Sequence, residues 1–171
     1  YGGTERVVHW LTEELVRMGH DVTLFASGDS RTSARLVSPC DQALRLANCV
    51  DPLAYHILML GQVFSERFDI VHFHIDYMHF PMSMCAGISH VTTLHGRLDL
   101  KDLAGVYRRW NQFPLVSISD DQRRPLAFAN WAGTVHHGMD EGLYRFRPRS
   151  EGYLAFLGRI SPEKRPDRAI A

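Results

Sequence analysis

The sequence predicts an α/β fold built on a doubly wound parallel sheet. Short, continuous apolar runs, typical of strands buried on both faces, alternate with segments of helical periodicity. This rhythm requires parallel pairing through right-handed crossovers. The 171 residues, 45% hydrophobic and 22% charged, suffice for one full core.

The first predicted helix runs from Thr4 to Met18. Its apolar face repeats at spacings of three and four: Val7, Val8, Leu11, Leu15 and Met18. We expect Thr4 to cap its start and Gly19 to supply the left-handed stop. On the polar face, Glu13 and Arg17 are predicted to pair at i,i+4.

The later elements follow the same alternation. Buried strands are expected at 22–26, 68–73, 90–93, 115–118 and, more weakly, 133–135. Asp51 followed by Pro52 predicts the start of a helix that continues to about residue 67. Further helices are expected near 78–85 and 100–109, and Ser119 is predicted to cap a short helix that Pro125 disturbs.

A polar connector at 141–152, rich in Arg and Pro, precedes a new apolar run at 153–157. Ser161 and Pro162 then predict the start of another helix. We therefore expect residues 1–150 to form one domain. Residues 151–171 are expected to be the linker exit and the first strand and helix of a second domain. Both ends of the chain are expected to be cut.

Composition excludes several classes of protein. Nineteen basic residues balance nineteen acidic ones, so the chain has no net positive charge that would attract nucleic acid or an anionic membrane. No apolar window reaches the length of about 18 residues that a membrane helix needs. Neither a signal peptide nor a Cys-x-x-Cys spacing is present. These observations favour a cytoplasmic protein with buried free thiols.

Ligands of open α/β sheets bind at the carboxyl ends of the strands, so residues at those ends are the site candidates. Gly2 and Gly3 precede a helix N-terminus, where backbone amides favour an anion such as diphosphate. The alternative for this pair is a tight turn without a ligand.

His72, His74 and Asp76 lie on one side of the predicted strand if it continues straight. Together they form a possible metal-ligand set. Because such strands are covered on both faces, a hydrogen-bonded core position is favoured for His72. His74 and Asp76, at the strand end, are candidates for polar contacts in a cleft.

Two more strands end on histidine. His95, followed by Gly96, could donate to a phosphate or sugar hydroxyl or move a proton, or it could merely anchor its loop. His136 and His137 precede Gly138, for which we expect a positive backbone φ in a turn. The histidine pair by itself indicates little.

The most specific candidate is the segment 156–164. It places Arg159 and Lys164 around a predicted helix N-terminus directly after a strand. Two cations and free helix amides complement a diphosphate. A solvated, charged first turn is the alternative.

Five stretches carry a family resemblance in their order along the chain: 2–8 (GGTERVV), 19–26 (GHDVTLFA), 69–74 (DIVHFH), 93–96 (TLHG) and 158–164 (GRISPEK). The set resembles the amino-terminal domain of the family 4 retaining glycosyltransferases and extends over nearly the whole chain. The resemblance implies one Rossmann-like half of a GT-B fold, in which two such domains face each other across a cleft.

The resemblance also implies roles for individual residues. His95 matches the active-site histidine that contacts the transferred sugar, and Gly2 and Gly3 match the glycine loop near the donor phosphates. Arg159 and Lys164 match the pair that neutralises the donor diphosphate as it leaves. The implied partners are a nucleotide-sugar donor and an acceptor glycan, lipid or small molecule, with peripheral membrane contact through the acceptor; no cofactor is implied.

The chain departs from the family pattern at three places. His137 precedes Gly138 where the family usually has Asn. The strand expected before Gly2 and the paired glutamates of the carboxy-terminal domain are missing, so we expect the chain by itself to be inactive. Two other functions remain open: a non-catalytic nucleotide- or glycan-binding module, and a metal-dependent hydrolase that uses His72, His74 and Asp76.

Overall fold

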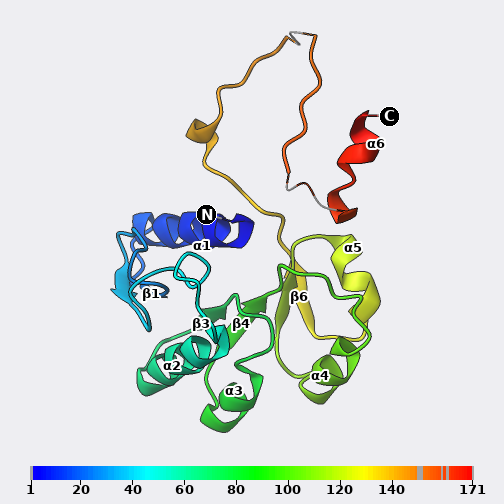
Figure 1. Ribbon diagram of the computed structural model, residues 1–171. Coiled ribbons are helices and arrows are strands. Elements are labelled where there is room, and N and C mark those ends of the chain that lie inside the picture. The colour runs from blue at the N-terminus through cyan, green and yellow to red at the C-terminus, as the bar shows by residue number, and fades with distance from the viewer. Residues whose placement is uncertain (1, 150–151, 159, 161, 171) are drawn as a thin grey trace. The chain divides into compact units, whose positions relative to one another are not determined.

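Figure 1 shows the computed structural model, which describes residues 2–149, 152–158, 160 and 162–170. The chain divides into two compact units, Tyr1–Met139 and Asp140–Ala171. The first unit contains all the strands of the described residues. The second contains only short helices.

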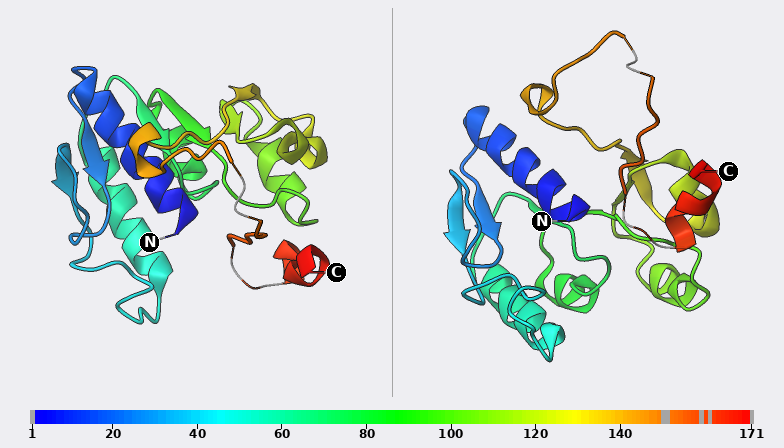
Figure 2. Two further views of the ribbon diagram at one scale, coloured as in Figure 1. Left: turned by 90° about the horizontal axis from the view of Figure 1, so that it is seen from above. Right: turned by 45° about the horizontal axis from the view of Figure 1, so that its top comes forward.

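The first unit begins with helix α1 (Gly3–Arg17), which ends where Gly19 adopts φ 92°. Strand β1 (Thr23–Phe25) pairs in parallel with β2 (Arg35–Val37). Both views of Figure 2 show α1 beside this pair. Glu13 joins the two parts, since its carboxylate accepts hydrogen bonds from Thr32 Oγ1 at 2.6 Å and from the Ser33 amide at 3.0 Å.

A second, four-stranded sheet holds the remaining strands in the order β3-β4-β5-β6, all parallel. The strands are β3 (Val71–Phe73), β4 (His90–Thr93), β5 (Leu115–Ser117) and β6 (Trp131–Thr134). Parallel neighbours in sequence order bring the carboxyl ends of all four strands to one edge. The loops after these strands therefore lie close together.

Helices connect the strands of this sheet. Helix α2 (Pro52–Ser65) starts at Asp51, whose carboxylate accepts from the Leu53 amide at 3.0 Å. Helices α3 (Phe80–Ala86) and α4 (Leu103–Arg109) pack against one side of the sheet (Figure 1). Helix α5 (Asp120–Arg123), capped by Ser119, continues into the 3₁₀ turn η1 (Arg124–Leu126) at Pro125.

Two apolar clusters stabilise the first unit. The larger contains Phe80 from α3, Leu94 directly after β4, Leu115 from β5 and Tyr107 from α4, all nearly inaccessible to solvent. The smaller joins Leu60 and Val63 of α2 to Phe73 of β3. Burial of these side chains is the main favourable contribution to folding of this unit.

The second unit contains the 3₁₀ turns η2 (Glu141–Leu143) and η3 (Pro162–Lys164) and the short helix α6 (Pro166–Ile170). The predicted strand at 153–157 is wrong, because these residues have no pairing partner in the described part of the chain. Arg165, with φ 49°, separates η3 from α6, so the single predicted helix is divided. The predicted cap Ser161 lies outside the described residues.

The predicted α/β class with parallel strands is confirmed, with two differences. The strands are divided between two sheets. The sequence predicts that β1 is buried on both faces, but all three of its residues are only half-buried. Most predicted boundaries are confirmed within a few residues, including the strand at 90–93. None of the described helices is long and apolar enough to cross a membrane.

Several local predictions are wrong. Thr4 lies inside α1, whose N-cap is Gly2. Arg17 pairs with Glu14 rather than Glu13, because Glu13 is occupied by Thr32 and Ser33. The three cysteines are free as expected, but none is fully buried, and Cys85 is exposed.

Candidate functional site

Three histidines from three strand ends meet at the carboxyl edge of the four-stranded sheet. His74 follows β3, His95 follows β4 and His137 follows β6. His74 Nδ1 and His95 Nε2 share a hydrogen bond at 2.9 Å, and His95 Nδ1 and His137 Nε2 share one at 3.1 Å. His137 reaches His95 although β5 lies between their strands in the sheet.

The surroundings of this histidine chain favour neutral rings. Burial lowers the pKa of His74 to about 3 and the pKa of His95 to about 4. Neighbouring imidazoles make a smaller contribution to both shifts, because a second positive charge close by is unfavourable. At pH 7 both rings are therefore uncharged, and each has one N–H donor and one nitrogen acceptor.

His72 extends the cluster at its inner end. Its ring stacks on His74 with centroids 4.2 Å apart, and His72 Nε2 shares a 2.7 Å hydrogen bond with Thr93 Oγ1. Desolvation lowers the pKa of His72, although part of the residue reaches solvent. The expected hydrogen bond is present, but the expected core position is wrong, since this part of the sheet face is uncovered.

The metal-ligand interpretation of His72, His74 and Asp76 finds no geometric support. The strand ends at Phe73, and Asp76 adopts a left-handed backbone with φ 54°, so the alternation of a straight strand stops before it. In the described part of the chain, no group of three or more His, Cys, Asp or Glu residues could hold a metal ion. The nitrogens of His74, His95 and His137 point at one another rather than converging on a shared point.

Asp76 is exposed, and it acts electrostatically on Tyr107 of α4. Its charge contributes to raising the pKa of the Tyr107 hydroxyl, after the larger effect of burial. No hydrogen bond of the described residues joins the Asp76 carboxylate to His72 or His74. Asp76 therefore remains a candidate cleft residue on sequence grounds alone.

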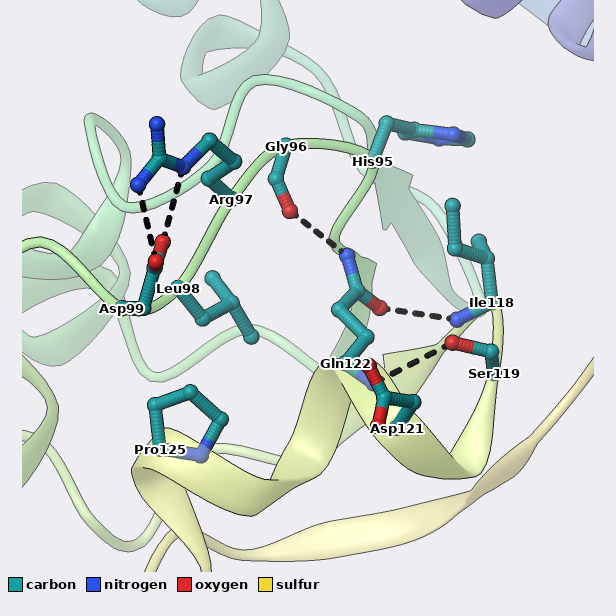
Figure 3. Close-up of a pocket in the computed structure, with 10 residues that line it drawn as sticks. All are labelled: His95, Gly96, Arg97, Leu98, Asp99, Ile118, Ser119, Asp121, Gln122 and Pro125. Atoms are coloured by element: carbon teal, nitrogen blue, oxygen red, sulfur yellow. Dashed lines mark hydrogen bonds and ion pairs between the residues drawn. The ribbon is translucent and has the colours of Figure 1, made fainter. Parts of the chain in front are cut away.

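Gln122 of α5 fixes the loop that carries His95. Its amide nitrogen donates to the Leu94 carbonyl at 3.0 Å and to the Gly96 carbonyl at 2.8 Å. Its amide oxygen accepts from the Ile118 backbone at 2.9 Å. Figure 3 shows this side chain between the two loops. Gln122 thus links the ends of β4 and β5 on both sides of His95.

A cavity of about 420 Å³ lies beside His95. Its wall is built from the β4–α4 loop and the start of α5 (Figure 3). The lining mixes apolar and polar groups, and the polar ones include the carboxylates of Asp99 and Asp121 and the hydroxyl of Ser119. Arg97, also in the wall, is ion-paired with Asp99. Such a surface suits a ligand with several hydroxyl groups.

The candidate glycines, Gly2, Gly3 and Gly138, are exposed and are not part of this hydrogen-bonded chain. Gly2 caps α1 with φ 81°, a conformation that favours glycine, and Gly3 opens the helix. Gly138 does not have the expected positive φ, so that prediction is wrong. A Cβ at Gly138 would meet no atom within 4 Å. In the described residues, no hydrogen bond joins these glycines to the histidines.

The predicted diphosphate pair belongs to the second unit. Arg159 lies outside the described residues. Lys164 is exposed at the end of η3. The structure therefore brings His74 and His95 together, while Lys164 stands on a separate unit.

Two residues of the site were missed from the sequence. His137 was considered only as half of an uninformative pair, because no local pattern reveals a contact across 42 positions. Gln122 left a weak signal, since Ser119 and Gln122 have the Ser-x-x-Gln spacing of a capping box. In a capping box the glutamine would accept from the backbone amide of the N-cap residue Ser119, whereas here it accepts from the amide of Ile118, one residue earlier.

Comparison with known families gives one result. The model of the family described as Glycosyltransferase Family 4 matches residues 1–120, which include β1 to β5, His74, His95 and the start of α5. His137 and the second unit lie beyond the matched segment. No curated protein matches the chain.

Proposed function

The chain belongs to Glycosyltransferase Family 4, and from that premise we propose that the protein transfers a hexosyl group from a nucleotide sugar to an acceptor with retention of anomeric configuration. Membership supports a glycosyltransferase with a sugar donor and an acceptor. The parallel α/β unit is consistent with one Rossmann-like half of a GT-B fold. The hexosyl donor, the retention and the roles of single residues are our proposal.

The observation that best supports this proposal is the position of His95 beside a cavity. His95 follows β4 at the carboxyl edge of the sheet and lines the cavity of about 420 Å³. This edge is where parallel α/β sheets bind their ligands. The carboxylates and hydroxyl of the wall can hold a sugar by hydrogen bonds to its hydroxyls.

In this proposal two domains, with a boundary at residue 150, have separate roles. Residues 1–150 form the acceptor-side domain, and residues 151–171 begin the donor-binding domain. Gly2, Gly3, Arg159 and Lys164 hold the donor diphosphate, while His74, Asp76 and Gly138 contribute contacts in the cleft. The acceptor is a glycan, lipid or small molecule, with peripheral membrane contact in the lipid case. We also propose a cytoplasmic location and no cofactor.

The proposed transfer breaks the bond between the anomeric carbon and the diphosphate oxygen and forms a bond from that carbon to the acceptor oxygen. The acceptor hydroxyl loses its proton, and the departing diphosphate accepts it. Arg159 and Lys164 stabilise the negative charge that develops on the leaving group, which is where most of the rate enhancement should arise. His95 orients the transferred sugar.

The experiment is a titration of the full-length protein with a panel of nucleoside diphosphates and nucleotide sugars, followed by turnover with the donor that binds. We expect one donor class to bind tightly and to yield a product of unchanged anomeric configuration by NMR. EDTA should leave the rate unchanged. His95→Ala should lower kcat by about 10²-fold, as expected for loss of a positioning contact.

The other outcomes have definite meanings. Binding without turnover by a protein that also holds a complete donor-binding domain would replace the enzyme with a non-catalytic binding module. An inverted product would contradict the proposed retention. Stoichiometric zinc by elemental analysis, with rates abolished by EDTA, would instead favour the hydrolase alternative. His20→Gln, at an exposed position after α1, is the control for His95→Ala.

A further inference from the structure

We propose that His74, His95 and His137 form a proton relay along the carboxyl edge of the sheet, in which His137 rather than His95 presents the nitrogen that meets a substrate hydroxyl. The inference rests on the proposed function for its part in sugar transfer. The relay itself can be tested without any transfer.

Both ring nitrogens of His95 are already engaged. Nε2 is bonded to His74 Nδ1 at 2.9 Å and Nδ1 to His137 Nε2 at 3.1 Å. An imidazole has only these two polar atoms, so while both hydrogen bonds are made His95 contacts the transferred sugar through its ring carbons and not through a nitrogen. The His95 ring lines the cavity, but both of its nitrogens form hydrogen bonds to the neighbouring histidines.

The two terminal nitrogens are the ones left for a ligand. In the part of the chain that the structure describes, neither His74 Nε2 nor His137 Nδ1 has a hydrogen-bond partner. His74 is half-buried and stacked on His72, whereas His137 is exposed. The nitrogen that an incoming hydroxyl can reach is therefore Nδ1 of His137.

Neutral rings in series allow two arrangements of protons. In the first, His137 Nε2–H donates to His95 Nδ1 and His95 Nε2–H donates to His74 Nδ1. This leaves a lone pair on His137 Nδ1 and a proton on His74 Nε2. In the second, both hydrogen bonds are reversed, so His137 Nδ1 carries the proton and His74 Nε2 the lone pair.

Conversion between the two arrangements moves one proton without leaving a charge. His137 Nδ1 takes a proton from a hydroxyl, one proton shifts across each hydrogen bond, and His74 Nε2 releases one to water. Every ring changes tautomer and ends neutral, so protons and charge balance. In the proposed transfer this relay is a second route for the acceptor proton, in addition to its uptake by the departing diphosphate.

The surroundings keep the inner rings in the form that a relay needs. Burial of His74 and His95 disfavours the imidazolium, and the titratable neighbours that act on them are His72 and the other two members. A hydrogen bond between Thr93 Oγ1 and His72 Nε2 orients the His72 ring, which stacks on His74. Gln122 fixes the backbone on both sides of His95.

The first test is ¹⁵N NMR of the protein labelled at histidine. We expect His95 to show coupled tautomers at pH 7, hydrogen-bonded ring protons shifted downfield, and no protonation of the ring until well below pH 6.5. His137→Gln should alter the His95 resonances. His136→Gln is the matched control, at an adjacent exposed position outside the relay. A His95 ring that protonates near pH 6.5 and ignores His137→Gln would overturn the relay.

The second test separates proton movement from simple orientation of His95. In His137→Gln the side-chain amide can still bond to His95 Nδ1, but it cannot change tautomer. We expect kcat to fall by about 10²-fold in both His137→Gln and His137→Ala, with KM little changed and His136→Gln unaffected. Recovery of the wild-type rate in His137→Gln would reduce His137 to a positioning residue.

The two tests also separate this inference from the proposed function. If the full-length wild-type protein turns over no nucleotide sugar although the NMR signature is present, the proposed function fails and the relay stands. If turnover is normal but the signature is missing, the relay fails by itself.

Discussion

The two units of the chain use similar apolar residues with opposite results. In the first unit, Phe80 and Leu94 are completely buried between helices and sheet. In the second, Leu154 and Leu157 are 95% and 92% exposed although they belong to a run that reads as a strand. The short run 71–73 became β3 because β4 pairs with it, while 153–157 has no partner among the described residues.

The comparison shows that an apolar run indicates a capacity for strand formation and not the strand itself. A strand is stabilised by hydrogen bonds to a neighbour and by side chains that cover its faces. The first unit supplies both within its own sequence. The stability of the molecule should therefore reside almost wholly in residues 1–139, and the predictions below test that asymmetry.

The largest effect is expected from truncation of the core. Phe80→Ala removes a ring that contacts Tyr107, Trp110 and Phe113, and it should lower the free energy of unfolding by about 3–5 kcal/mol. Leu157→Ala, in the second unit, should change it by less than about 0.5 kcal/mol. Urea unfolding followed by tryptophan fluorescence measures both. Comparable losses would show that the second unit has a core of its own.

A second difference concerns pH, because residues 140–171 contain no histidine. Burial lowers the pKa of His79 to about 3, below the value of about 6.5 in an unfolded chain. The unfolded state then binds more protons between these values, so stability is complete above about pH 6.5 and declines as the pH falls toward 3. Each such histidine contributes a slope of up to about 1.4 kcal/mol per pH unit.

The double variant His79→Phe/Thr92→Val isolates this contribution. It removes both partners of the 3.0 Å hydrogen bond between Thr92 Oγ1 and His79 Nε2 and keeps the volume of the buried pair. We expect the slope of stability to flatten by about 1.4 kcal/mol per pH unit near pH 5 and by about half as much near pH 6.5, where an unfolded histidine is half protonated. Urea midpoints across that range provide the measurement. An unchanged slope would mean that His79 does not titrate on unfolding.

The smallest effect compares two aspartate caps of the same chemistry. Asp51 accepts from the Leu53 amide at the start of the 14-residue helix α2, and Asp140 accepts from the Gly142 amide at the three-residue turn η2. Asp51→Ala should cost about 1 kcal/mol of global stability. Asp140→Ala should have no measurable effect on the urea transition of the first unit. Equal losses would show that the two units unfold together.

Local signals predicted much of the first unit. The Asp51-Pro52 pair, the Ser119 cap and the left-handed Gly19 identified their helix ends, because a cap is formed by residues adjacent in sequence. Continuous apolar runs located the strands for the same reason. The partner of Glu13 could not be predicted, since Thr32 and Ser33 approach it only after β1 and β2 pair.

The sequence by itself determined the α/β class, the family and the placement of histidines after strand ends. These features depend on residue type and on spacing over a few positions. Only the tertiary structure decided that His74, His95 and His137 are hydrogen-bonded in series, and that Gln122 holds the loop of the middle one. Parallel pairing puts successive strand ends on one edge, so residues 21 and 42 positions apart become neighbours. The order of nitrogens in that row depends on strand order and loop path, which no local pattern encodes.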